Sequence, residues 1–350
     1  MSNLRTFYAC QAVAVAPVIP NADGVTFSSG TYNYIRGAQS VGLNSSFDTE
    51  NLFELGQLEI YDAVLNLPQI EITIEKILDG YKTVYGLLAS GQPLVQASKH
   101  RANVQFALFP DTSNAVSNGA IKIVECTGMY INSVTYTFPV DGNITESVTL
   151  VGNHKQWYIG PSGAELNTNG SPTMSTSFGV PTAIANGTGI PDDNPRSVTS
   201  LNPYASGILR RQNIVFRGPG QEKAQSVTFT LNLNREDIFE FGKRIPYAKI
   251  ATYPIEATVE VQSLAVSGSY DDISFNENTT VVPQKNVGLE VEVKVSGADG
   301  VGAFLINTGS GNFLTAINHT GGDAGGGNAT VTRNYTAYNV FNIVDSGMAS

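Results

Sequence analysis

The stretch that decides the fold is AQSVTFTLNLNREDIFEFGKRIPYAKIATYPIEATVEV, from Ala224 to Val261, because the chain contains it twice. The first copy runs from Ala38 to Glu75, at an offset of 186 residues that slips by one near its end. The copies share roughly 14 identities over roughly 37 positions, where chance would give about 2, and such self-similarity indicates an internal repeat. The sequence therefore predicts a duplicated unit.

Each copy also predicts one short helix, of about two turns. Asp48 and Asn234 stand where an N-cap side chain would accept a hydrogen bond from the first turn. Gly56 and Gly242 then occupy the C′ place, where a left-handed backbone favours glycine.

The end of each copy predicts a half-buried strand. Behind Pro68 and Pro254, apolar residues alternate with Glu and Thr in the matching segments 70–75 and 255–260. A period of two, with one polar and one apolar face, is typical of a strand that buries one face. The predicted repeat unit is strand, short helix, loop, strand.

Two further landmarks recur at an offset of 185: an alternating apolar run and a turn. The run is Val104, Phe106 and Leu108 against Leu289, Val291 and Val293, and the turn is Gly142-Asn143-x-Thr145 against Gly327-Asn328-x-Thr330. We therefore predict two tandem homologous domains, residues 1–160 and 206–350. Residues 161–205, rich in Gly, Pro, Ser and Asn, are expected to be a linker or a surface insertion.

Further strands are predicted from period-two patterns, with Asp141-Gly142 as a hairpin turn. They are Phe7–Val15, Tyr32–Ile35, Asn103–Phe109, Ala120–Glu125, Met129–Phe138, Ser147–Val151, Ser226–Leu233 and Thr330–Ile343. The segment Lys76–Ser90 contains a turn signal but no pattern that assigns the rest of it. The expected fold class is mainly all-β.

Composition agrees with a strand-rich, acidic chain. Of 350 residues only 14% are charged, and the net charge is −10. The first 160 residues carry 8 basic and 13 acidic residues and the remainder 12 and 17, so each part is −5. The acidity therefore belongs to the repeat rather than to one tail.

Targeting and cysteine signals are sparse. Residues 1–20 lack the pattern of a secretory signal, and no stretch reaches the roughly 18 apolar residues of a membrane span. We expect no membrane association and a cytoplasmic site of synthesis. Cys10 and Cys126 are expected to be reduced structural thiols.

Catalytic and metal-binding signals are weak. His100, His154 and His319 have no partner at metal-ligand spacing, and carboxylate pairs such as Glu71 with Glu75 read as solvated strand charges. The glycine run before Asn328 does not lie between a strand and a helix, so a phosphate-binding loop is not indicated. We expect neither enzymatic activity nor a cofactor or metal.

The repeated block resembles bacteriophage tail tube proteins. The resemblance lies in REDIFEFGKRIPY (Arg235–Tyr247), in Tyr253–Val261, and in the hairpin TYTFPVDGN (Thr135–Asn143) with Thr145-Glu146-Ser147. The first copy, Leu52–Glu75, extends it to both halves, whereas residues 161–205 and the N-terminus show none.

The resemblance implies a structural virion protein of the phage tail, assembled in the host cytoplasm. Members are β-sandwich or barrel-like domains with one short helix, stacked in six-fold rings whose inner strands close a barrel. A duplicated chain would then form trimers with pseudo-six-fold symmetry. The implied partners are other copies of the chain, the tape measure, tail terminator and baseplate or tip proteins, and double-stranded DNA in passage.

Two sets of residues follow as candidate sites. The lumen is expected to be lined by glutamates on polar strand faces: Glu71, Glu75, Glu256, Glu260, Glu290 and Glu292. The ring-assembly element is expected to contain Phe53, Glu54, Gly56, Tyr61, Pro68, Phe239, Glu240, Gly242, Tyr247 and Pro254.

Other classes remain open at this point. A baseplate or capsid protein differs from a tube protein only in its assembly. A glycan-binding adhesin would need exposed aromatic clusters, for which Trp157 with Tyr158 is the sole candidate. A glycan hydrolase would need an acidic pair in a cleft, and the sequence gives no signal for one.

Overall fold

The computed structural model describes residues 11–21, 27–89, 92–108, 122–159, 164–166, 172–174, 208–218, 223–242, 246–265, 287–294, 302–321 and 327–345. Antiparallel strands dominate these residues, which confirms the all-β class. The first-half strands are β1 (Gln11–Pro20), β2 (Phe27–Ser29), β3 (Asn33–Tyr34), β4 (Ala38–Ser46), β5 (Thr49–Phe53), β6 (Ile60–Leu65), β7 (Gln69–Ile77), β8 (Arg101–Leu108), β9 (Lys122–Pro139), β10 (Thr145–Gly152), β11 (His154–Ile159), β12 (Ala164–Leu166) and β13 (Pro172–Met174).

The remaining strands lie beyond residue 208. They are β14 (Ile214–Arg217), β15 (Ala224–Asn232), β16 (Arg235–Ile238), β17 (Ala248–Ala251), β18 (Glu256–Leu264), β19 (Glu290–Lys294), β20 (Gly302–Asn307), β21 (Phe313–Thr320), β22 (Thr330–Tyr338) and β23 (Asn342–Val344). Two short helices, α1 (Val84–Ala89) and α2 (Leu94–Ala97), and a 3-10 turn at Arg211–Asn213 complete the described elements.

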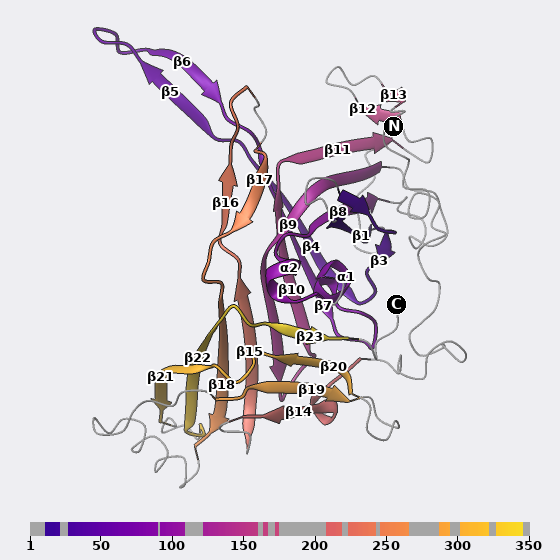
Figure 1. Ribbon diagram of the computed structural model, residues 1–350, viewed down its shortest axis with the longest axis vertical. Coiled ribbons are helices and arrows are strands. Elements are labelled where there is room, and N and C mark those ends of the chain that lie inside the picture. Colours follow the sequence, from indigo (N-terminus) through magenta and orange to yellow (C-terminus); the bar gives the residue numbers. More distant parts are fainter. Residues whose placement is uncertain are drawn as a thin grey trace.

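One long antiparallel sheet runs through both halves of the chain (Figure 1). Its strand order is β4-β7-β10-β9-β15-β18-β22-β21, so a first unit of four strands is followed by a second unit of four. We call this the main sheet. The junction between the two units is the pairing of β9 with β15.

A second layer covers one face of each unit. In the first half the order is β1-β8-β9-β11, with β2 and β3 on β1 and with β12 and β13 beyond β11. In the second half the order is β14-β19-β20-β23. The 18-residue strand β9 serves both layers of the first half, whereas the separate strands β20 and β21 serve the two layers of the second.

The core lies between these layers and is one continuous apolar cluster. Aromatic rings from both halves meet there: Tyr136 lies 5.4 Å from Phe304 between ring centroids, and Phe341 packs edge-on against Tyr85 of α1 at 5.8 Å. Because the apolar residues of each strand occur at every second position, the opposite face of the main sheet is left polar.

A buried carboxylate fastens α1 to the main sheet. Glu146 on β10 accepts hydrogen bonds from the Tyr136 hydroxyl at 2.6 Å and from the backbone N–H groups of Val84 and Tyr85 at 2.7 and 2.9 Å. Burial raises the pKa of Glu146, although these donors oppose the shift. Nearby, the buried Lys76 ammonium donates to Asp79 at 2.9 Å.

The predicted helices at 48–56 and 234–242 are wrong: both segments belong to β-hairpins, β5–β6 and β16–β17. Gly56 and Gly242 do have a positive φ, of 92° and 79°, but they lie in hairpin loops. A left-handed glycine suits a hairpin loop as well as a helix C′ position, so this signal does not separate the two. Helices form instead in the segments of α1 and α2.

Most predicted strands are confirmed, with shifted ends. The two expected strands Ala120–Glu125 and Met129–Phe138 form the single strand β9, and Asp141-Gly142 lies in the turn to β10. Residues 7–10 of the first predicted strand, and most of the predicted linker, lie outside the described residues.

Candidate functional site

The exposed face of the main sheet is lined by small polar residues in continuous rows. One row crosses seven strands in register: Ser40, Glu75, Ser147, Thr135, Thr230, Thr258 and Thr336. A second row contains Gly42, Thr73, Thr149, Ser133, Asn232, Glu256 and Tyr338. We call this surface the polar face. It spans both units without interruption.

Four of the predicted lumen glutamates lie on the polar face. Glu71 and Glu75 project from β7, and Glu256 and Glu260 project from β18, all four exposed. Among the parts of the eight strands that cross this face there is no Lys or Arg, since Lys76 and Arg333 point into the core. The face is therefore negative over both units.

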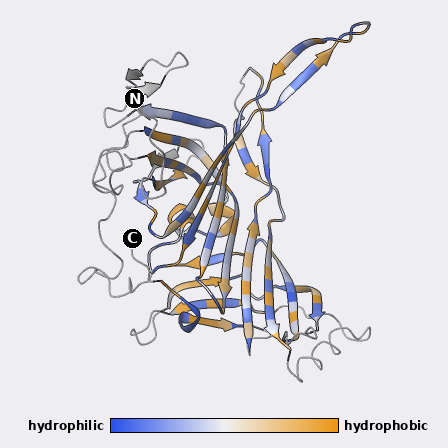
Figure 2. Ribbon diagram, turned by 180° about the vertical axis from the view of Figure 1, so that it is seen from behind, coloured by the Kyte–Doolittle hydropathy of each residue, from blue (hydrophilic) through white to orange (hydrophobic). Residues whose placement is uncertain are grey.

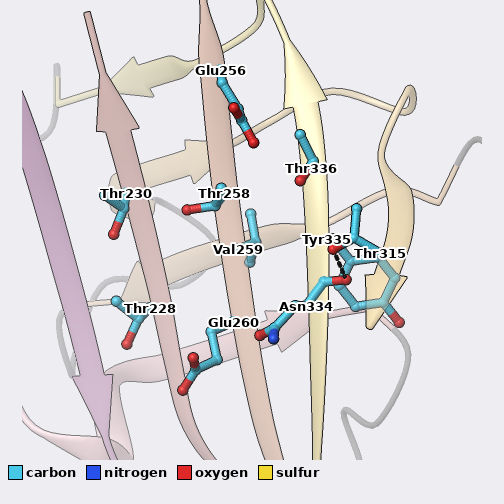
Figure 3. Close-up of a pocket in the computed structure, with 10 residues that line it drawn as sticks. All are labelled: Thr228, Thr230, Glu256, Thr258, Val259, Glu260, Thr315, Asn334, Tyr335 and Thr336. Carbon is cyan, nitrogen blue, oxygen red and sulfur yellow. Dashed lines mark hydrogen bonds between the residues drawn. The ribbon is translucent and has the colours of Figure 1, made fainter. Parts of the chain in front are cut away.

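The second unit's part of the polar face forms an open hollow of about 510 Å³ (Figure 3). Four neighbouring strands line it, with Thr228 and Thr230 on β15, Glu256, Thr258 and Glu260 on β18, Asn334 and Thr336 on β22, and Thr315 on β21. Glutamates four residues apart on one strand are separated by about 13 Å. That separation exceeds the roughly 5–9.5 Å of a glycosidase carboxyl pair.

The other two predicted lumen residues lie elsewhere. Glu290 and Glu292 are on β19, in the second layer, and both are ion-paired with Arg217, the Glu292 contact measuring 2.8 Å. The alternation that placed them on a polar strand face was correct, but the face belongs to a different sheet. The structure does not bring them together with Glu71, Glu75, Glu256 and Glu260.

Two hairpin arms project from the main sheet (Figures 1 and 2). Arm 1 comprises β5, β6 and their loop, and arm 2 comprises β16, β17 and their loop. Both carry large apolar side chains that are exposed: Leu52, Phe53, Leu55, Leu58, Ile60, Tyr61, Val64 and Leu65 on arm 1, and Ile238, Phe239, Phe241, Tyr247 and Ile250 on arm 2. Exposed apolar clusters of this kind are typical of protein–protein contacts.

The predicted ring-assembly residues map onto these arms. Phe53, Tyr61, Phe239 and Tyr247 are exposed on them, and Glu54, Gly56, Glu240 and Gly242 lie next to their turns. Pro68 and Pro254 mark where each arm returns to the main sheet. The sequence predicts a helix, loop and strand at these positions, whereas the structure places them on and beside the two hairpins.

Arm 2 is fixed at its base by a half-buried arginine, Arg235, which the sequence did not single out as a site residue. Arg235 donates from Nε to the Ile131 carbonyl at 2.9 Å and from Nη1 to the carbonyls of Ser98 and Lys249 at 2.7 and 3.1 Å. Its guanidinium lies 5.0 Å from the centre of the Tyr130 ring. Burial lowers the pKa of Arg235 to about 10.

Cys126 and His100 are buried, whereas His154 and His319 are exposed. Cys126 is a buried free thiol, and burial raises its pKa to about 12, whereas Cys10 lies outside the described residues. His100 is buried with Nδ1 3.3 Å from the Leu88 carbonyl, and His154 Nδ1 lies 2.8 Å from the Thr127 hydroxyl. In the described ranges, no group of three or more His, Cys, Asp or Glu residues is placed to hold a metal ion.

None of the helices in the described ranges has the length and apolarity needed to span a membrane. Neither protein-family models nor curated proteins match this chain.

Proposed function

We propose that this chain is the major tail tube subunit of a bacteriophage, a structural protein without catalytic activity. The observation that carries the proposal is the main sheet itself: two units of four strands in the same order lie side by side, with a polar, acidic face and two open edges. Within the described residues, β4 and β21 each pair with a main-sheet strand on one side only. Open edges of this length invite pairing with another chain.

The two units are best explained by a duplication, and the duplication sets the ring. Each copy of the chain supplies two units, or eight strands. Three copies therefore supply six units and 24 strands. A barrel of 24 strands spaced about 4.8 Å apart and tilted by about 35–45° has a backbone diameter of about 45–50 Å. Such a ring is a trimer with pseudo-six-fold symmetry, and its bore admits duplex DNA.

The polar face would form the wall of that bore. DNA carries one negative charge per about 1.7 Å of its axis, so a wall of hydroxyls and glutamates repels it and does not retain it. At physiological salt the electrostatic repulsion reaches only about 8 Å, so it acts on DNA that is close to the wall of the bore. Glu71, Glu75, Glu256 and Glu260 are the charges that carry this effect.

The arms would join neighbouring copies and rings, because their apolar side chains are exposed in the described part of the chain. The partners then follow from the place in the tail: other copies of the chain along the tube, the tape measure protein inside it, and terminator and baseplate or tip proteins at its ends. Assembly would take place in the cytoplasm of the host bacterium.

Negative-stain electron microscopy of the concentrated protein tests the proposal. We expect rings or hollow tubes whose end-on averages show three-fold outer features around a six-fold inner wall. A chain that remains monomeric, or that forms solid fibres or closed shells, would overturn it.

The conduit role has its own test, in tubes of two charge-matched variants. Glu71→Lys/Glu75→Lys places lysines on the polar face, whereas Glu290→Lys/Glu292→Lys makes the same change in net charge on the second layer. Only the first is expected to retain short duplex DNA, by about tenfold in Kd at low salt, with the effect lost as salt rises. Equal DNA retention by both variants would contradict a lumen at the polar face.

A further inference from the structure

The junction between the two units is a complete example of how one unit joins the next. β9, the last strand of the first unit, pairs antiparallel with β15, the first strand of the second. On the polar face, Thr135 lies opposite Thr230, with Thr137 opposite Thr228 and Ser133 opposite Asn232 on either side. The register of this junction is therefore fixed within the chain.

One open edge of the main sheet, β4, is equivalent to β15. Both strands begin with Ala-Gln-Ser-Val, and both ladders shift by one residue at the same place, between Ala38 and Ser40 and between Ala224 and Ser226. Aligning the two irregularities puts Asn44 of β4 at the level of Thr230 of β15.

The other open edge, β21, is equivalent to β9. Each of these strands has one extra, unpaired residue in its ladder with the next strand of the chain. The extra residue is Asn132 in the ladder of β9 with β10, and Thr315 in the ladder of β21 with β22. Aligning these two irregularities puts Asn318 of β21 at the level of Thr135 of β9. Both Asn44 and Asn318 are exposed at their edges.

We infer that a second copy of this chain pairs its β4 with β21 of the first copy, with Asn44 opposite Asn318. The junction between copies would thus repeat the junction between units within a copy. The flanking pairs on the polar face are Gly42 with Thr320 and Ser46 with Ala316. The inference rests on the proposed tube and adds the register of its subunit contact.

The stagger of the strands supports this register. Following the paired residues across the first unit, from Ser40 on β4, leads to Thr230 on β15. Thr230 lies four residues beyond Ser226, the residue of β15 that is equivalent to Ser40. A stagger of four residues over four strands gives a shear equal to the strand number. Barrels of that kind have a strand tilt of about 36°, within the range of closed barrels.

The second unit matches the first only if the inferred pairing holds. Following the paired residues across the second unit, from Ser226 on β15, leads to Asn318 on β21. If Asn318 pairs with Asn44 of the next copy, the path ends four residues beyond Ser40, which is the same stagger as in the first unit. A slip of one residue would turn the polar side chains of one strand to the core. A slip of two would make the two units stagger unequally.

Engineered cysteines test the register. In the variant Asn44→Cys/Asn318→Cys, the two cysteines of one chain are seven strand spacings apart, or about 34 Å, so any bond joins two copies. Directly opposed Cβ atoms lie about 4.5–5.5 Å apart, near the reach of a disulfide, so tubes are treated with an oxidant and, in parallel, with a short bifunctional thiol reagent. Gly42→Cys/Thr320→Cys is the second variant; a Cβ on Gly42 would make only ordinary contact with Thr73.

The matched control is Ser40→Cys/Asn318→Cys, whose cysteines would be about 13 Å apart in the inferred register. We expect both test variants to give covalent dimers and trimers that end at the trimer, and the control and parent chains to give none above background. Tubes that cross-link in the control but in neither test variant would overturn the register and leave the tube standing. Covalent products larger than a trimer would support the register but overturn the three-copy ring. The absence of any tube or ring would overturn the proposed function itself.

Discussion

The two units of the main sheet have the same kind of polar face, but they differ on the opposite, core-facing side, which is called the underside below. In the first unit the underside carries Lys76 and Glu146, opposite each other on β7 and β10, both buried, with α1 fastened to Glu146. At the same level in the second unit, Ser263 lies opposite Val331, and the cover is the sheet β14-β19-β20-β23. Since the polar face and the edge strands are the features in common, they are where a function shared by both units belongs.

The arms differ in the same way. The base of arm 2 is tied to the first half through Arg235, while the matching position in arm 1 is Thr49, an exposed residue. All described residues of β5 and β6 are exposed. The strands of arm 1 are therefore uncovered in the described structure, whereas arm 2 is oriented by contacts within the chain.

Changing the tip of arm 1 should have the largest effect, and on assembly alone. Leu55 and Leu58 are both 103% exposed, so Leu55→Asp/Leu58→Asp should alter the free energy of unfolding by no more than about 0.5 kcal/mol. Sedimentation velocity should show no assembly at concentrations where the parent chain forms tubes. Ile208→Asp, a half-exposed residue away from the arms, is the control and should assemble normally; normal assembly of the arm variant would contradict a contact at this tip.

Removing the buried carboxylate of the first unit should cost the most stability. Glu146→Ala leaves the Tyr136 hydroxyl and two backbone N–H groups without their acceptor, which should lower the free energy of unfolding by about 3–5 kcal/mol. Val331→Ala, at the same level in the second unit, removes only apolar contacts and should cost about 1–3 kcal/mol. Urea denaturation measures both, and equal losses would mean that the Glu146 hydrogen bonds add nothing to packing.

Freeing arm 2 should cost less. Arg235→Ala removes three hydrogen bonds to backbone carbonyls and should lower the free energy of unfolding by about 2–3 kcal/mol. Hydrogen exchange of β16 and β17 should accelerate, because the base of the arm loses its contact with Ser98 and Ile131. Thr49→Ala in arm 1 should stay within about 0.5 kcal/mol. Unchanged exchange in arm 2 would show that the Lys249–Asp237 ion pair alone orients it.

Much of the fold could be predicted because strand periodicity and turn residues act locally. The helices failed because an N-cap residue and a left-handed glycine also suit a hairpin, and the pairing of β5 with β6 decided between them. The register of the strands could not be predicted either. The sequence alignment of the two copies matches Glu75 with Glu260, whereas the strand pairing places Glu75 level with Gln262, two residues further along the same face. Glu290 and Glu292 likewise required knowledge of which sheet holds β19.

The smallest expected effect is a difference in pH dependence between the two units. Burial raises the pKa of Glu146 in the folded chain above its ordinary value near 4.5, so folding favours the protonated form. Stability from this group is therefore complete below the unfolded pKa and is lost as pH rises through the folded pKa. As the pH falls toward about 4.5, the urea midpoint of the parent chain should rise relative to that of Glu146→Gln. Asp345, whose pKa burial also raises, is common to both chains and cancels in the difference, so parallel profiles would mean that Glu146 titrates alike in the folded and unfolded states.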